Sequence, residues 1–233
     1  MKINDKFYDS KVVNKPWGYE HVVYRDKKLL CITLLKIDYK KTTSLHCHPE
    51  KKSGFILLKG KALFQLGLWK KRSEIHNSPS KRMIARGLFH SIKSISREGL
   101  LALEFETPVN KNDLVRFKDV YGRQQKSYEG KKYTKNITNS FVKFKKPIVG
   151  KKQIYSIGNT TLSIEVHKNF SLLLKNKPNT IFAILKGSIV DKNKRKVISQ
   201  GDVIRTVDLK VLSKVFKING NLSVIRVLNK SNK

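Results

Sequence analysis

Two histidines two residues apart, inside a series of short apolar segments, constrain this chain more than any other feature. Residues 44–48 are Ser-Leu-His-Cys-His, and in the segment 53–67 that follows, apolar residues flank Gly60. Short apolar runs separated by glycine indicate a strand, a turn and a second strand. Side chains at positions i and i+2 of a strand point to the same face, so His46 and His48 are predicted to converge.

A third histidine, His90, follows Gly87 at the end of another such segment. If His90 comes from a neighbouring strand, it completes a set of three imidazoles. Imidazole is the commonest metal ligand, and three ligands with an open position are typical of a catalytic metal site. A His-x-His pair also arises by chance in β proteins. We predict one divalent metal ion on His46, His48 and His90, with zinc, iron, manganese and nickel left open.

The order of these segments resembles the two motifs of the cupins. In that family the first motif supplies His-x-His, a Glu and a Gly, and the second supplies Pro-x-Gly-x-x-His. The resemblance implies an all-β, cupin-type jelly-roll barrel that holds a metal in its mouth. The chain departs from the pattern at Ser53, where the family has its Glu ligand, and at Ala85, where the family has Pro. Glu50 shares strand parity with the two histidines and is the candidate replacement for the acid.

A closer resemblance lies within the cupins. Residues 14–20 contain Lys-Pro-Trp-Gly, which resembles the signature that begins the cupin domain of type II phosphomannose isomerases, often fused to mannose-1-phosphate guanylyltransferases. Residues 103–106 lie where those proteins carry Glu-Val-Gln. Residues 112–123 resemble their Asp-Ile-Val-Arg…Asp-x-Tyr-Gly-Arg ending.

This resemblance implies sugar-phosphate binding, a divalent metal that polarises the substrate, and an arginine near the pocket. The matching arginine here is Arg116, whose guanidinium fork suits phosphate. Its alternative role is a salt bridge to Asp113 or Asp119. Trp17 either stacks on a sugar face as a substrate-binding residue or plugs the base of the barrel.

The segments of strand character divide the chain into parts. We expect strands at 18–25, 29–38, 42–48, 54–66, 82–86, 89–95, 100–106, 152–166, 170–175, 180–191, 196–198, 202–207, 211–217 and 222–228. Between them, residues 124–150 are polar, Lys-rich and aperiodic. The expected organisation is therefore a metal-binding barrel at 1–123, a linker or arm at 124–150, and a second β domain at 151–233.

The second half echoes the first. Residues 181–187 parallel residues 54–60, and both runs end in Lys-Gly. Counting back from Gly187 with the spacing of the first half places Leu173 and Lys175 at the positions of the histidine pair. We therefore expect a bicupin whose second barrel is degenerate and carries no metal. The alternative is a coincidental strand–glycine–strand pattern.

The charge of the chain bears on its partners. The 233 residues include 50 Lys and Arg against 17 Asp and Glu, a formal net charge of +33. Such a charge attracts nucleic acid, anionic membranes or phosphorylated ligands. The basic residues are mostly lysines scattered along the chain, whereas base readout relies strongly on arginine. The joint abundance of Lys, Asn and Ile is what an AT-rich coding sequence produces, so we expect no specific nucleic-acid binding.

Cysteine usage and the apolar runs indicate the compartment. The two cysteines, Cys31 and Cys47, lie inside apolar strand patterns and are too few for a disulfide framework. Residues 1–6 contain no apolar segment of a signal peptide, and no apolar run approaches membrane-spanning length. A cytoplasmic protein with reduced thiols and no membrane partner is expected.

These observations together predict a metal-binding cupin of sugar metabolism. Its expected reaction is the isomerisation or epimerisation of a phosphorylated or nucleotide-linked sugar, with Glu50 or Glu104 as the catalytic base. The first alternative is a non-catalytic sugar-binding or sensing cupin, favoured by the loss of the acid at Ser53. The second is a basic nucleic-acid-binding protein, favoured by charge alone. A homodimer is left open.

Overall fold

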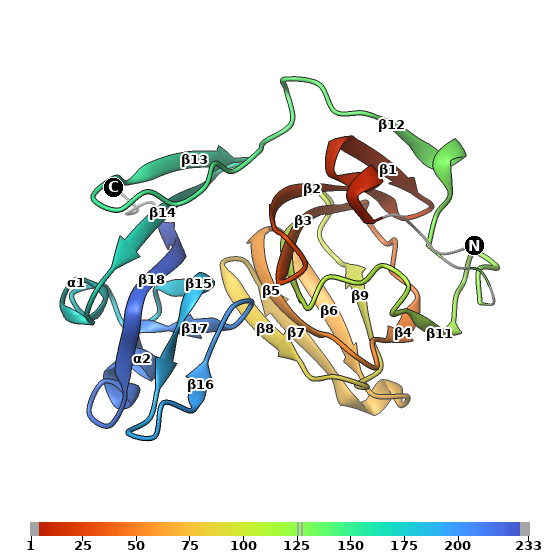
Figure 1. The fold of residues 1–233 in the computed structure, drawn as a ribbon. Helices are drawn as coiled ribbons and strands as arrows, with labels where there is room; N and C mark the ends of the chain where they lie inside the picture. Colours follow the sequence, from red (N-terminus) through yellow and green to blue (C-terminus); the bar gives the residue numbers. More distant parts are fainter. Residues whose placement is uncertain (1–4, 125, 127, 229–233) are drawn as a thin grey trace. The chain divides into compact units, whose positions relative to one another are not determined.

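The computed structural model describes residues 5–124, 126 and 128–228. The chain forms two compact units, residues 1–143 and 144–233, and each is described by itself. Both are built from antiparallel strands (Figure 1). Cys31 and Cys47 are buried free thiols. None of the helices among these residues is long and apolar enough to cross a membrane.

The first unit consists of two antiparallel sheets. The seven-stranded sheet has the order β12 (Thr134–Asn136), β1 (Lys11–Lys15), β2 (Gly18–Asp26), β3 (Leu30–Ile37), β10 (Leu100–Thr107), β5 (Lys52–Lys59) and β8 (Ser80–Ile84). The five-stranded sheet has the order β11 (Val115–Lys118), β4 (Leu45–Cys47), β9 (His90–Ser94), β6 (Lys61–Leu66) and β7 (Ser73–Asn77). Three 3-10 helices accompany them, η1 (Asp5–Ser10), η2 (Lys70–Arg72) and η3 (Lys131–Tyr133).

The core of this unit lies between the two sheets. Strand β6 alternates buried and outward residues, as a strand with one face on the core must. Its Phe64 joins Ile92 of the same sheet in one apolar cluster with Leu35 and Phe55 of the other sheet. Four neighbouring strands of each sheet, β3-β10-β5-β8 and β4-β9-β6-β7, have the order of an eight-stranded, double-sheet jelly roll. The predicted all-β class and cupin-type barrel are confirmed for this unit.

Gly60 marks the corner where the chain passes from one sheet to the other. It joins β5 to β6 with φ +85°, and a Cβ at this position would meet the carbonyl oxygen of Gly99 at 2.2 Å. Only glycine accepts both the left-handed backbone and that close approach. The predicted strand–glycine–strand is therefore present.

The second unit consists of one sheet and two short helices. Its sheet has the order β13 (Gln153–Ile157), β14 (Thr160–His167), β18 (Lys217–Leu228), β15 (Ile181–Val190) and β16 (Lys196–Ile198), and β17 (Val203–Arg205) pairs with β15. Helix α1 (Ser171–Leu174) lies in the segment that we expected as a strand at 170–175, and helix α2 (Thr206–Leu212) overlaps the ends of the expected strands 202–207 and 211–217. They supply Leu173 and Leu209 to an apolar cluster with Phe182 of the sheet.

The expected second barrel is therefore not confirmed. Gly187 has the left-handed φ of Gly60, at +86°, and a Cβ there would meet the carbonyl oxygen of Asn221 at 2.3 Å. However, β15 continues through Gly187 within one sheet, whereas the chain changes sheets at Gly60. Among the described residues of this unit, helices cover the core where a jelly roll has a second sheet.

The segment 124–150 divides between the two units. Strand β12 pairs with β1 and so belongs to the first unit. Phe144 is 8% exposed and packs against Tyr155 of the second unit, with 4.7 Å between their ring centroids. This segment is thus an arm of the first barrel up to residue 143 and part of the second unit from residue 144.

Candidate metal centre

The three predicted histidines meet inside the first barrel. His46 in β4 pairs directly with His90 in β9, and His48 follows β4 on the same side as His46. The ring centroid of His46 lies 4.9 Å from the ring centroid of His48 and 4.5 Å from that of His90. One ligand nitrogen from each ring lies within 4.8 Å of the other two. Within the described part of the chain, this is the group of His, Cys, Asp and Glu residues that could hold a metal ion.

Backbone carbonyls fix all three rings in one tautomer. Nδ1 of His46 lies 2.8 Å from the carbonyl oxygen of Ser44, and Nδ1 of His90 lies 3.0 Å from the carbonyl oxygen of Leu88. Nδ1 of His48 donates to the carbonyl oxygen of Asp113. A carbonyl oxygen only accepts, so each Nδ1 carries the proton and each Nε2 keeps its lone pair. This is the arrangement that orients metal-ligating histidines.

The Nε2 atom of His90 supports the same interpretation. It is buried and has no hydrogen-bond partner among the described residues. A buried, unsatisfied nitrogen costs free energy, which a metal ion on the triad would recover. Three imidazoles suit zinc, copper, iron or nickel. The triad therefore fits a divalent metal, as predicted.

The electrostatics keep the imidazoles neutral, which is the form that binds metal. Burial holds the pKa values of His46 and His48 well below the usual range. The neighbouring imidazoles add to the effect at His46, and the Lys51 ammonium adds to it at His48. Burial also lowers the pKa of His90 to about 4.

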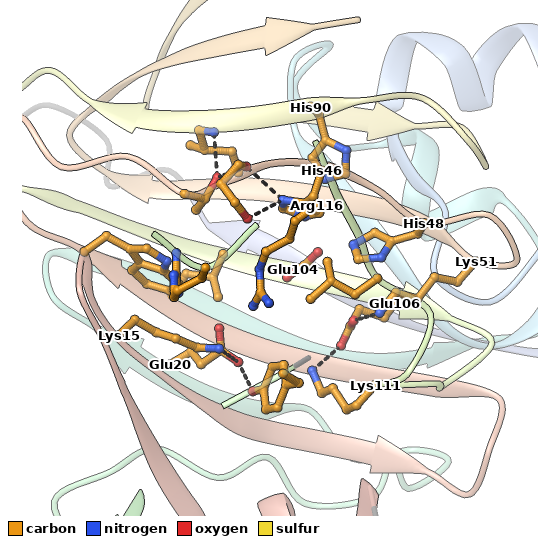
Figure 2. A pocket seen from close by; sticks show the side chains of 18 of the residues that line it. Lys15, Glu20, His46, His48, Lys51, His90, Glu104, Glu106, Lys111 and Arg116 are labelled. Atoms are coloured by element: carbon orange, nitrogen blue, oxygen red, sulfur yellow. Dashed lines mark hydrogen bonds and ion pairs between the residues drawn. The ribbon is translucent and has the colours of Figure 1, made fainter. Parts of the chain in front are cut away.

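Two carboxylates of β10 face the same cavity (Figure 2). Burial raises the pKa of Glu104 to about 7, and the charge of Glu106 contributes to the rise. Burial would also raise the pKa of Glu106, but the ammonium groups of Lys111 and Lys51 outweigh it and hold that pKa well below its usual value. Lys111 lies 2.7 Å from Glu106, and Lys51 donates to its other oxygen.

The structure brings Glu104 to the cavity and leaves Glu50 outside it. Glu50 is exposed and accepts a hydrogen bond of 2.9 Å from the side-chain amide of Asn110. Its backbone N–H donates to the carboxylate of Asp113, which turns the chain away after β4. The alternation of side chains along β4 does not extend to Glu50, because the strand ends at Cys47.

Arg116 and Trp17 both line the cavity. Arg116 lies opposite His46 in the pairing of β11 with β4, and its guanidinium lies 3.7 Å from the Glu129 carboxylate. The carboxylate that pairs with Arg116 at this distance is thus Glu129, which we had not considered, and the charge of Asp119 also acts on the guanidinium. Trp17 is 4% exposed and belongs to the apolar core, so it packs in the barrel and borders the cavity at once.

The sequence alone did not indicate several of the residues that line the cavity. The side chain of Lys15 is 4% exposed and lies 3.4 Å from Glu20, and it also pairs with Glu129. Lysines are so frequent in this chain that those with buried side chains, such as Lys15, carry no distinguishing signal. The charged residues that line the cavity are Lys15, Glu20, Lys51, Glu104, Glu106, Lys111, Arg116 and Arg123.

We compared the chain with known protein families, curated proteins and solved structures, and found similarity only to solved structures, at low sequence identity. No protein-family model matches the sequence, and no curated protein matches it. Among solved structures, the chain is similar to the capsular polysaccharide assembling protein CapF from Staphylococcus aureus, with 12% identity and a TM-score of 0.42 over 46% of this chain and 34% of that one.

Two further solved structures are similar. An uncharacterised protein with a double-stranded β-helix domain from Klebsiella pneumoniae has 14% identity and a TM-score of 0.37 over 46% of this chain and 88% of that one. A putative sugar phosphate isomerase from Acidithiobacillus ferrooxidans has 17% identity and a TM-score of 0.34 over 41% and 63%. The chain thus spans less than two thirds of CapF and of the putative isomerase. The sheets and the triad of the chain itself carry the functional argument.

Proposed function

We propose that the first barrel binds a divalent metal ion and acts on an anionic sugar, by isomerisation or epimerisation of a phosphorylated or nucleotide-linked sugar. The observation that carries the proposal is the set of three neutral imidazoles whose Nδ1 protons are all held by backbone carbonyls. Glu104 stands in the same cavity, so a proton carrier accompanies the metal position.

The residues of the chain have distinct roles in this proposal. A bound metal ion would supply Lewis acidity at a substrate oxygen. In an isomerisation, Glu104 takes the proton from the hydroxyl-bearing carbon beside the carbonyl group and returns it to the carbonyl carbon, while the hydroxyl proton passes to the carbonyl oxygen. With a pKa of about 7, its carboxyl group is present in both the basic and the acidic form near neutral pH.

The cations that line the cavity favour an anionic substrate. Arg116 lies there with Lys15 and Arg123, and a guanidinium can bind phosphate with two parallel hydrogen bonds. The cations are already paired with Glu129 and its neighbours, which holds them in place. A phosphate would therefore meet preorganised donors.

The runner-up is a sugar-binding protein without catalytic activity. Ser53 favours it, because a hydroxyl stands where an acidic ligand would tighten the metal site. Turnover of sugar phosphates, measured with and without added metal, separates the two functions. Metal-dependent turnover supports the enzyme, and binding without turnover supports the sensor.

The metal itself is tested by elemental analysis of the purified protein. We expect one divalent ion per chain, and His48→Ala should weaken binding by at least about 100-fold, because two neutral ligands hold metal poorly. His76→Ala is the matched control, since His76 lies in β7 and bonds to Glu74. Unchanged metal content in His48→Ala would contradict the assignment of the triad.

A further inference from the structure

Strand β5 carries a buried hydroxyl with no hydrogen-bond partner among the described residues. Ser53 is 1% exposed, and its Oγ atom is unsatisfied. Ser53 is directly opposite Glu106 in the pairing of β5 with β10, and Phe55 follows two residues later. Both of these neighbours line the cavity, and paired residues share a face of the sheet, so the hydroxyl points into the barrel.

Other contacts place Ser53 near the metal position. The ring of Phe55 lies 6.1 Å from that of His90. Lys51, two residues before Ser53, lines the cavity, and its positive charge lowers the pKa of all three histidines. His90 carries the second unsatisfied polar atom of this region, its Nε2. Each of the two sheets of the barrel thus carries one buried polar atom without a partner among the described residues, Ser53 Oγ on β5 and His90 Nε2 on β9.

The charges in this part of the cavity are not balanced for a metal ion. The ligand group contains three neutral imidazoles and no acid. The nearest charged cluster, Lys51, Glu106 and Lys111, contains two cations and one carboxylate, with side chains at most 5% exposed (Figure 2). Even with Glu104 ionised, the two lysines and the two carboxylates only balance, so a divalent ion would add two uncompensated positive charges to a buried region, at a large desolvation cost.

We propose that the ligand itself supplies the missing negative charge: a carboxylate or phosphate oxygen of the sugar completes the metal's coordination and accepts a hydrogen bond from Ser53 Oγ. This inference rests on the proposed function and names the class and orientation of its substrate. The anionic oxygen at the metal faces the triad and is therefore distinct from the phosphate that Arg116 and its neighbours would bind in the proposed function. Lys51 has three N–H donors, of which the described residues accept two, so it can also face the anion.

The test is the coupling between metal and anion. Zinc is titrated into metal-free protein alone and with D-glucuronate, D-glucose 6-phosphate or neutral D-glucose. We expect at least one of the two anions to raise the zinc affinity of the wild type by about 10-fold or more, with a reciprocal effect of zinc on the anion. D-glucose should have no such effect. Whichever anion responds identifies carboxylate or phosphate as the source of the oxygen.

Variants at Ser53 locate the effect. Ser53→Glu brings its own carboxylate, so zinc should bind about 10-fold more tightly without any anion, and the coupling should disappear. Ser53→Ala should reduce the coupling several-fold. Ser80→Ala is the matched control, because Ser80 is also buried and unsatisfied but lies in β8 opposite Leu57, four residues further along β5 than Ser53. The visible spectrum of the cobalt-loaded protein should change when the anion binds, which reports direct coordination.

The outcomes separate this inference from the proposed function. If zinc binds to the wild type and neither anion changes its affinity or the cobalt spectrum, the inference is overturned and the metal site stands. Coupling that survives in Ser53→Glu also overturns it. If zinc binds neither alone nor with an anion, the proposed function fails instead.

Discussion

At the residue scale, β10 shows how surroundings separate two identical side chains. Glu104 and Glu106 are two residues apart on one face, yet only Glu106 is paired with lysines. Burial therefore dominates at Glu104, whose pKa rises to about 7, whereas Glu106 stays ionised. Environments that push two pKa values apart are typical of acid–base sites. This contrast motivates the choice of Glu104 as proton carrier.

The raised pKa of Glu104 predicts a pH effect on stability. The folded metal-free protein holds this proton more tightly than the unfolded chain, so its contribution is full below pH 4.5 and is lost as the pH rises toward 7. The loss amounts to about 3 kcal/mol for this group. In Glu104→Gln, urea unfolding with a chelator present should show a smaller decrease in stability over this window than the wild type.

The exposed Glu98 provides the control for that experiment. Glu98→Gln should keep the pH dependence of the wild type. If Glu104→Gln and the wild type lose stability in parallel between pH 4.5 and 7, the raised pKa of Glu104 is contradicted.

Residue-scale prediction from sequence worked where a periodic rule applied. Strand parity was enough to bring His46 and His48 together, and a glycine turn preceded His90. Glu50 was misplaced because the same parity was extended past the end of β4. The buried side chain of Lys51 could not be found, since its burial depends on Glu106, a partner 55 residues away.

At the element scale, the glycines at the two ends of β6 share a backbone conformation but differ in the space around them. Gly60 and Gly67 flank β6, and both have positive φ, +85° and +76°. A Cβ at Gly60 would collide with the backbone of Gly99, whereas a Cβ at Gly67 would meet nothing within 4 Å. Both positions therefore require a left-handed backbone conformation, but only Gly60 lacks room for a side chain.

This difference predicts unequal costs for two matched substitutions. Gly60→Ala should destabilise the protein by more than about 3 kcal/mol, because the backbone oxygen of Gly99 cannot move without disturbing the strand corner. Gly67→Ala should cost about 1 kcal/mol, the penalty of a left-handed non-glycine residue. Chemical denaturation of both variants measures the costs. Equal losses of stability would refute the role of Gly60 as a close-approach corner.

Element types were predictable where apolar runs were long and bounded by glycine, as for β5 and β15. Helix α1 was predicted as a strand and α2 overlaps the ends of two predicted strands, because short apolar runs have no period that distinguishes the two structures. Leu173 shows the reason: it was counted as a strand position by analogy with His46, yet it packs from α1 onto the sheet. Tertiary packing decided what local sequence left open.

At the scale of the whole molecule, the charge is spread along the chain. The net charge of +33 is large, whereas the buried cations of the cavity are mostly paired with carboxylates. The surplus therefore resides mainly on lysines outside the cavity. Such a surface attracts polyanions by releasing their counterions, without reading a sequence.

The last prediction separates this general attraction from specific nucleic-acid recognition. Duplex DNA should bind at low ionic strength with equal affinity for unrelated sequences, because scattered lysines contact phosphates and not base edges. Its affinity should fall by about 1,000-fold or more between roughly 50 and 200 mM salt, as expected for six or more phosphate contacts. Fluorescence anisotropy with two duplexes of different sequence measures both quantities. A sequence preference that persists at the higher salt would favour the nucleic-acid-binding alternative over the sugar-binding barrel.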